Sequence, residues 1–350
     1  MTRREGGWGA AGVDPLKSIR GRPIEILTRE DVKFSSGGIA VEIFGELGFE
    51  SRLVTDEEFD TSPDRIVFIG GNAAWHERAL DRIRPLPRTH RPGVIVWHSE
   101  PLPFPRAAGL RLAPMTPREI GKVILRDRRV SDPHSNARHM RRIAREGIID
   151  LLTVAARSYQ AFLAEEGISS ELIPVGYHPI HGHLLDLERD IDVLFLGDLR
   201  VRRRKQILRR LERDGLDVHA VGSYSDQRYW GEGRTQLLNR AKILLNLPRH
   251  AGLLADLRLI LGMAAGALVI SEPVYLPDPF EPGKHYVEAT IEEMPETARR
   301  YLADEDARRR ITEAGHAFVT QELTWEHSFA DLLALAAERL PPLAARATSP

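Results

Sequence analysis

The stretch IDVLFLGDLRVRRRK, residues 191–205, joins a short apolar run to Gly197 and Asp198 and then to a dense basic cluster at residues 200–205. An apolar strand that ends in glycine and leads into a helix is one step of a βα repeat. The cluster falls in the first turn of that helix, where positive charge opposes the helix dipole. An anionic ligand at the strand end would remove this conflict. A solvent-exposed basic helix face is the alternative, because Arg209, Arg210 and Arg213 continue the run.

The same alternation of short apolar runs with longer amphipathic segments extends outward in both directions. It predicts stacked βαβ units and a parallel sheet in each half. Strands are expected at 24–28, 51–56, 64–71, 93–100, 150–155, 170–175, 192–198, 217–222, 242–248 and 267–272. The stretch GYHPIHGHLLDLERD, residues 176–190, interrupts this periodicity with Gly, Pro and His.

We therefore expect an α/β fold with two Rossmann-like, doubly wound parallel-sheet domains. The expected parts are a loose tail at 1–22, a first domain at 23–180, a second domain at 181–325, and a C-terminal helix and tail at 326–350. We expect that last helix to pack back on the first domain.

Composition narrows the function classes. A chain of 350 residues with 42% hydrophobic content can fill two cores, and a net charge of −1 argues against a nucleic-acid partner. The absence of cysteine excludes thiolate chemistry and disulfides and is compatible with the cytoplasm. The N-terminus lacks the apolar core of a signal peptide, and no run is long enough for a membrane span. The excess of arginine over lysine suggests a G+C-rich, bacterial genome.

One motif carries a family resemblance. The stretch RLILGMAAGALVISEP (258–273), followed by DPFEPGKHYVEA (278–289) and TARRYLADEDARRRITEAG (297–315), resembles the donor half of GT-B glycosyltransferases, especially the spore-coat group with a family 4-like donor domain. The segment SSGGIAVEIFGELGFESRLVTD (35–56) matches the usual GT-B opening.

This resemblance implies two domains that face a cleft. The second half would bind a nucleoside diphosphate sugar, with UDP, GDP or dTDP as the nucleotide, and the first half would hold an unknown acceptor. It implies no permanently bound cofactor and no metal. The residues expected to bind the donor are Gly37, Gly38, Gly197, Asp198, Arg202, Arg204, Lys205, Gly222, Asp256, Arg258, Ser271 and Glu272.

One position departs from the family pattern. Many relatives carry a ribose-binding glutamate five residues before the glycine of this motif, and here that position is Leu261. Asp256, earlier in the same helix, could substitute for it, or could simply be a first-turn acid favoured by the helix dipole.

Two polar residues end a predicted strand on the acceptor side, His98 and Glu100. Either is a candidate general base, and Asp31, after the first strand, is a third. His178, His181 and His183 lie close together but lack acidic partners at metal-ligand spacing, so we expect no metal site.

The sequence thus predicts a glycosyltransferase that moves a sugar from a nucleoside diphosphate to an acceptor. An oxidoreductase with two Rossmann-like halves is an alternative, although no G-x-G-x-x-G follows a strand. A non-catalytic GT-B partner protein is another, prompted by Leu261. Whether the chain forms a homodimer is left open.

Overall fold

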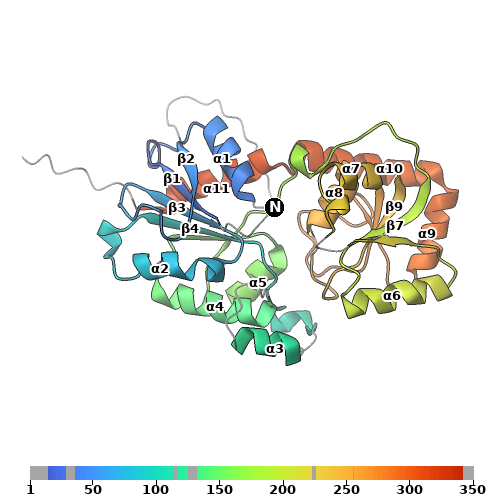
Figure 1. Ribbon diagram of the computed structural model, residues 1–350, viewed down its shortest axis with the longest axis horizontal. Coiled ribbons are helices and arrows are strands. Elements are labelled where there is room, and N and C mark those ends of the chain that lie inside the picture. Colours follow the sequence, from blue (N-terminus) through green and yellow to red (C-terminus); the bar gives the residue numbers. More distant parts are fainter. Residues whose placement is uncertain are drawn as a thin grey trace, which may run out of the picture.

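The computed structural model of the chain describes residues 15–28, 36–112, 117–124, 132–222, 226–254 and 256–341. Two α/β domains lie side by side (Figure 1). Each is built around one parallel sheet, so the fold class predicted from the alternating pattern is confirmed.

The first domain contains a six-stranded sheet with the order β2-β1-β3-β4-β5-β6. Its strands are β1 (Ile24–Leu27), β2 (Ser51–Val54), β3 (Ile66–Gly70), β4 (Gly93–His98), β5 (Leu151–Val154) and β6 (Glu171–Leu172). Its helices are α1 (Ser36–Glu46), α2 (Glu77–Ile83), α3 (Pro117–Ile124), α4 (Pro133–Glu146), α5 (Arg157–Glu165) and α11 (Trp325–Arg339). Strand residues alternate between two apolar layers: Ile66 and Phe68 pack with α1 and α11, whereas Val67 and Ile69 pack with α2, α4 and α5.

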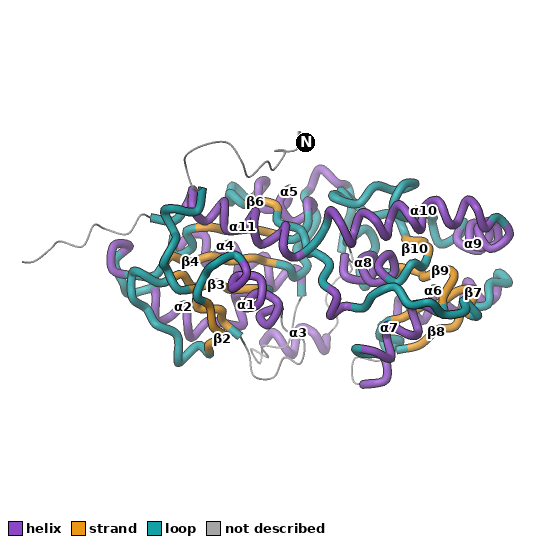
Figure 2. The backbone as a smooth tube through the Cα atoms, turned by 90° about the horizontal axis from the view of Figure 1, so that it is seen from above, coloured by secondary structure: helices purple, strands orange, loops and turns teal. Residues whose placement is uncertain are grey.

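The last helix, α11, packs among the elements of the first domain (Figures 1 and 2). Phe329 meets Phe68 edge-on at 5.9 Å and Trp325 meets Trp97 at 5.1 Å, both between ring centroids. Buried aromatic pairs of this kind add about 0.5–1.5 kcal/mol each beyond the area they bury. The C-terminal helix therefore forms part of the first domain's core.

The second domain has a five-stranded sheet with the order β11-β10-β9-β7-β8. Its strands are β7 (Ile191–Leu196), β8 (His219–Val221), β9 (Ala241–Asn246), β10 (Leu268–Ser271) and β11 (Val287–Glu288). Its helices are α6 (Arg202–Arg213), α7 (Glu232–Asn239), α8 (Asp256–Ala264), α9 (Met294–Ala303) and α10 (Glu305–Ala317). Helices α6 and α9 cover one face of the sheet, and α7 and α8 cover the other.

Two segments connect the domains and run side by side. The Tyr177 amide donates to the Leu323 carbonyl at 2.7 Å, and the Trp325 amide donates to the Tyr177 carbonyl at 2.9 Å. A Cβ on Gly176 would lie 2.3 Å from the backbone carbon of Thr324. Glycine is therefore required where the two segments cross.

An apolar contact between loops also joins the domains. The Phe104 ring packs edge-on against the Tyr275 ring, with 6.0 Å between centroids. Gly252 has a φ of +80°, and a Cβ there would lie 3.1 Å from both Leu110 Cδ1 and Phe104 Cζ. We call these four residues the apolar clasp.

Candidate functional site

The carboxyl ends of β7 and β8 form the floor of the candidate site. β7 lies between β8 and β9, so the chain winds in opposite directions on its two sides, and open α/β sheets bind ligands at such a point. Gly222 has a φ of +118°, and a Cβ there would lie 2.9 Å from the Gly197 carbonyl oxygen. Both glycines therefore bring the two strand ends close together.

A cavity of about 340 Å³ opens above these glycines. Its described lining residues come from β7, β9, α6, α7, α8 and the adjoining loops. They are Leu196, Gly197, Asp198, Arg204, Gly222, Tyr229, Trp230, Arg234, Leu238, Leu244, Leu257, Arg258 and Leu261. Five of the residues predicted to bind the donor therefore line one cavity.

Arg258 lies in the first turn of α8 and reaches the ends of two strands. Its Nε donates to the Leu196 carbonyl at 3.1 Å, and its Nη1 donates to Oδ1 of Asn246 at 2.8 Å. Burial, reinforced by the neighbouring charge of Arg204, lowers the pKa of Arg258 to about 9. Neutral oxygen acceptors hold this guanidinium, so its charge is not balanced by an adjacent carboxylate.

Arg204 and Arg234 add positive charge to the same cavity. Arg204 is buried and donates from Nε to the Leu247 carbonyl at 2.9 Å. Arg234 is 5% exposed, donates from Nη2 to the His181 carbonyl at 3.0 Å, and leaves Nε without a partner among the described residues. Burial lowers the pKa of both side chains, and the nearby carboxylates of Asp198 and Glu272 offset only part of this effect at Arg204. A buried, unbalanced charge is costly, and an anion in the cavity would offset that cost.

The helical period of α6 explains which cations of the basic cluster face inward. Arg204, Ile207 and Leu211 are buried on one face of the helix, whereas Arg202 and Lys205 are exposed and do not line the cavity. The spacing of Arg204 to the two apolar residues was the signal that could have identified it from the sequence.

Arg203 and Asp198 are held by partners of opposite charge. Arg203 forms a two-point ion pair with Glu272, in which Nη1 lies 2.8 Å from Oε2. Asp198 accepts from the Arg200 amide and Nε, each at 3.0 Å, and these hydrogen bonds hold its pKa below the usual value. Ser271, fully buried, accepts from Asn246 and donates to the Glu272 carbonyl at 2.8 Å. Ser271 and Glu272 therefore make structural contacts at the end of β10.

Among the cavity residues that were not anticipated from the sequence, three are aromatic or charged, namely Tyr229, Trp230 and Arg234. Tyr229 and Trp230 precede α7, and the Arg234 guanidinium carbon lies 5.9 Å from the centre of the Trp230 ring. The stretch YWGEGR, residues 229–234, contains this aromatic and basic signal. Only the tertiary fold brings it beside β7.

Asp256 is the first residue of α8, and its side chain lies outside what the structure describes. Leu257 and Leu261 of the same helix line the cavity. Among the described lining residues, the surface of α8 beside Arg258 is therefore hydrocarbon.

The acceptor-side candidates lie in the first domain. His98, the last residue of β4, is fully buried beside the backbone of Gly71 and Glu100, and neither ring nitrogen forms a well-aligned hydrogen bond with a described residue. Burial lowers its pKa to about 4, so the ring is neutral at pH 7. Glu100 is half-buried in the loop that follows. Gly37 and Gly38 begin α1, and Asp31 lies outside the described residues.

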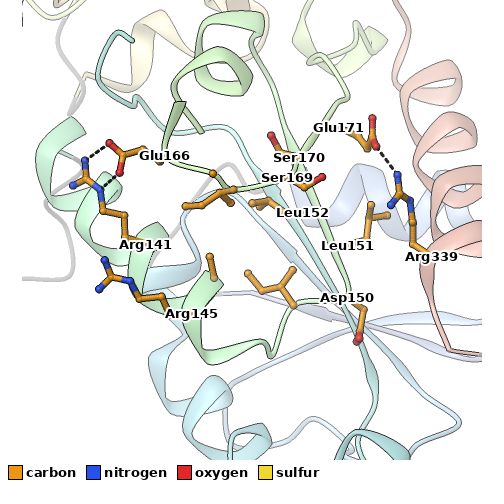
Figure 3. Close-up of a pocket in the computed structure, with 14 residues that line it drawn as sticks. Arg141, Arg145, Asp150, Leu151, Leu152, Glu166, Ser169, Ser170, Glu171 and Arg339 are labelled. Carbon is orange, nitrogen blue, oxygen red and sulfur yellow. Dashed lines mark hydrogen bonds and ion pairs between the residues drawn. The ribbon is translucent and has the colours of Figure 1, made fainter. Parts of the chain in front are cut away.

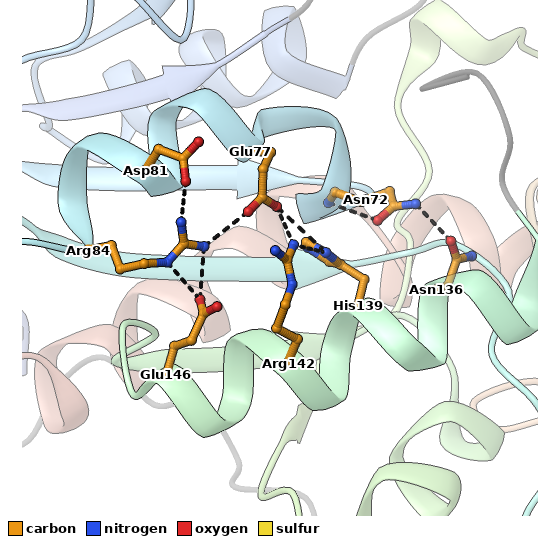
Figure 4. Close-up of polar contacts among 9 residues, drawn as sticks. Asn72, Glu77, Asp81, Arg84, Asn136, His139, Arg142 and Glu146 are labelled. Atoms are coloured by element: carbon orange, nitrogen blue, oxygen red, sulfur yellow. Dashed lines mark hydrogen bonds and ion pairs between the residues drawn. The ribbon is translucent and has the colours of Figure 1, made fainter. Parts of the chain in front are cut away.

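A polar network joins α2 and α4 (Figure 4). Its member His139 lies near enough to His98 to help lower the pKa of that imidazole. Glu77 accepts from Arg84 and Arg142, and Arg142 contacts Nδ1 of His139 at 2.9 Å. Burial lowers the pKa of His139 to about 4 as well. Each arginine of the network has a carboxylate partner, which favours a structural role.

A second cavity, of about 440 Å³, lies at the amino ends of β5 and β6 (Figure 3). Two of its three lining arginines are matched: Arg141 pairs with Glu166, and Arg339 pairs with Glu171, while Arg145 lies near enough to Glu166 to help lower the pKa of that carboxyl. It contains no predicted site residue and lies at the opposite edge of the sheet from the strand ends that bind ligands in this fold. The smaller cavity is thus the better candidate for an anion.

The described residues show neither a metal site nor a membrane-spanning helix. No group of three or more His, Asp or Glu side chains there is placed to hold a metal ion. None of the described helices has both the length and the apolar character needed to cross a membrane.

Comparison with known proteins agrees with this architecture. Residues 202–334 match a family model described as glycosyl transferase-like. No curated protein sequence matches the chain.

Solved structures of GT-B enzymes are similar in fold. HepE from Anabaena, in complex with UDP-glucose, is 10% identical, with a TM-score of 0.59, over 90% of this chain and 99% of HepE. Sucrose-phosphate synthase from Thermosynechococcus elongatus is 14% identical, with a TM-score of 0.58, over 91% of this chain and 98% of that enzyme. TarM is 11% identical, with a TM-score of 0.54, over 78% of this chain, which spans only 55% of TarM. The chain therefore has the GT-B fold; the finer spore-coat grouping rests on the sequence resemblance alone.

Proposed function

We propose that this GT-B chain is a glycosyltransferase whose second domain binds a nucleoside diphosphate sugar and whose first domain holds the acceptor. One observation carries the proposal: Arg204, Arg234 and Arg258 converge on one cavity at the carboxyl end of β7, and none of them forms a salt bridge with a described residue. A diphosphate supplies the missing negative charge. The glycosyl transferase-like match over residues 202–334 and the UDP-glucose complex of HepE agree with it.

The chemistry follows from this charge distribution. The acceptor hydroxyl oxygen forms a bond to the anomeric carbon as the bond from that carbon to the diphosphate oxygen breaks. The electron pair of the broken bond leaves with the diphosphate, where buried guanidinium groups stabilise the developing charge. If configuration inverts, a base takes the hydroxyl proton, and we assign this role to the Glu100 carboxylate. His98 is buried away from solvent and serves this role less well.

Thermal unfolding with and without ligand tests the proposal. UDP, GDP and dTDP are each added at a series of concentrations, with the nucleosides as controls. A diphosphate at about 100 times its Kd stabilises the fold by about 2.7 kcal/mol, whereas the nucleoside lacks the anion and stabilises it far less. If no diphosphate raises the Tm, the proposal is wrong. Release of free sugar from the matching donor then separates an enzyme from a non-catalytic binding protein.

A further inference from the structure

The described acceptors that anchor Arg258 in the donor cavity are neutral oxygens. Its Nε donates to the Leu196 carbonyl at 3.1 Å, and its Nη1 donates to Oδ1 of Asn246 at 2.8 Å. Its third nitrogen, Nη2, lies at the end of β7, where a Cβ on Gly197 would be only 3.2 Å from it. Gly197 lines the cavity. These contacts therefore hold the guanidinium at the strand end that forms the floor of the site.

The orientation of the Asn246 amide is fixed by Ser271. Asn246 ends β9 and Ser271 ends the neighbouring strand β10, and both side chains are fully buried. The Ser271 hydroxyl donates its one proton to the Glu272 carbonyl at 2.8 Å, so its oxygen can only accept from Nδ2 of Asn246, at 3.0 Å. Because Nδ2 is committed to Ser271, the other end of the amide, Oδ1, faces Arg258. The reversed amide would set an NH2 group against the guanidinium and leave two donors without an acceptor.

An amide at this position anchors the guanidinium without neutralising it. Arg203 shows the contrast, because the Glu272 carboxylate pairs with it and Arg203 does not line the cavity. A carboxylate in place of Asn246 would likewise take up the charge of Arg258, whereas the amide oxygen leaves that charge for an anion in the cavity. Resting on the proposed function, we propose that Asn246 is a positioning residue for the donor diphosphate, that it acts through Arg258, and that Ser271 holds it in the orientation required.

A cycle of variants at Asn246 and Arg258 tests this inference, with the Kd values of UDP, GDP and dTDP measured by calorimetry on the full chain. Asn246→Leu removes the acceptor, and we expect the Kd of each diphosphate that binds the wild type to rise at least about fivefold. The double variant Asn246→Leu, Arg258→Met should bind no more than about twofold more weakly than Arg258→Met alone, because no guanidinium is left to position.

Two outcomes of this cycle overturn the inference. One is a Kd in Asn246→Leu equal to that of the wild type. The other is a double variant whose loss of affinity equals the product of the two single losses, because Asn246 would then act on the fold and not through Arg258.

Ser271→Ala carries the same test if Asn246→Leu does not fold, because it removes only a hydroxyl. We expect its Kd to rise by about threefold or more, and we expect no further rise when it is added to Arg258→Met. Ser328 is the matched control, since it is also buried and donates to the Pro174 carbonyl at 2.9 Å in the first domain. Ser328→Ala should lower the Tm and leave the Kd unchanged.

Equal effects of the two serine variants on the Kd would overturn the inference. Failure of the wild type to bind any of the three diphosphates is a different result, because it overturns the proposed function itself and with it this inference.

Discussion

The guanidinium of Arg203 lies against the carboxylate of Glu272, with Nη1 2.8 Å from Oε2, and so joins the first turn of α6 to the end of β10. Arg203 also donates to the Pro248 carbonyl at 3.1 Å. Glu272 is 5% exposed, so its carboxylate left without Arg203 would be a poorly solvated charge. The pair fixes two elements that flank the donor cavity.

We predict that this pair is energetically coupled. Arg203→Met and Glu272→Gln should each lower the free energy of unfolding, and the double variant should lose about 1–3 kcal/mol less than the sum of the two single variants. Urea unfolding of the four proteins measures this coupling. Additive losses would show that the contact contributes little.

The neutral replacement of Arg258 should weaken donor binding. Arg258→Met removes a positive charge that faces the ligand in the cavity. Losing charge-assisted hydrogen bonds costs about 1.5–3 kcal/mol of binding free energy, so we expect the Kd of UDP to rise at least tenfold. Lys205→Met is the matched control, because Lys205 is exposed and does not line the cavity. Equal effects of the two substitutions would refute the assignment.

The lowered pKa of Arg258 makes this contribution depend on pH. The charged form binds the anion and predominates below a pKa of about 9, and a bound anion raises that pKa. The affinity advantage of the wild type over Arg258→Met should therefore be full at pH 7.5 and shrink as pH rises above 9. Both proteins are titrated with UDP, so any change in the ionisation of the UDP phosphates affects both Kd values equally and cancels in their ratio.

His98 should make the fold sensitive to acid. Its pKa is about 4 in the folded chain against 6.5 when unperturbed, so the unfolded state binds the proton more readily. This pKa difference contributes about 3 kcal/mol to the free energy of unfolding. The contribution is fully present above pH 6.5 and is lost as the pH falls from 6.5 toward 4.

The substitution His98→Leu tests this directly. Between pH 7.5 and pH 4.5, the free energy of unfolding should fall less in this variant than in the wild type. Leucine cannot be protonated and has no ring nitrogen to leave unpaired. His134→Leu, at an exposed position of α4, is the control and should leave the slope unchanged. A slope in His98→Leu equal to that of the wild type would assign the acid sensitivity to other groups.

The apolar clasp should hold the domains in the arrangement seen here. Gly252→Ala places a Cβ 3.1 Å from Leu110 and Phe104 at a φ of +80°, which a side chain rarely adopts. We expect a larger radius of gyration in small-angle scattering and a lower Tm, with Gly109→Ala as a control for positive φ without a nearby neighbour. If both variants scatter like the wild type, the clasp does not set the domain arrangement.

Ten of the eleven described strands and the C-terminal helix were predictable because their signals are local, whereas the two-residue strand β11 was not expected. Buried parallel strands are continuous apolar runs, and α11 begins at Trp325, one residue before the C-terminal segment expected at 326–350. Helix α4 was not predicted, since its arginines and histidines mask a sparse apolar face of Ala137, Met140 and Ile143. Its Asp132 cap and following proline were the available signal.

The candidate site was only partly predictable because contacts across the fold decide it. A run of cations does not reveal that Arg203 is paired with Glu272 while Arg204 enters the cavity. Arg234 comes from a helix about thirty residues farther along, and no short-range pattern connects it to β7. Strand-end glycines were identifiable, since close approach of two strands requires glycine whatever the ligand.

The proposed base gives the last prediction. Glu100 is half-buried after β4, whereas His98 is fully buried and, with a pKa of about 4, already neutral at pH 7. Glu100→Gln should lower kcat by about 10²–10⁴ and leave the Kd of the nucleotide unchanged, because proton removal is needed only when the acceptor attacks.

The assay follows sugar transfer from the donor found by thermal shift, and His98→Leu serves as the comparison variant. Loss of nucleotide binding in Glu100→Gln would indicate a structural role instead. Normal turnover in both variants would move the base to Asp31 or to a retaining reaction that uses none.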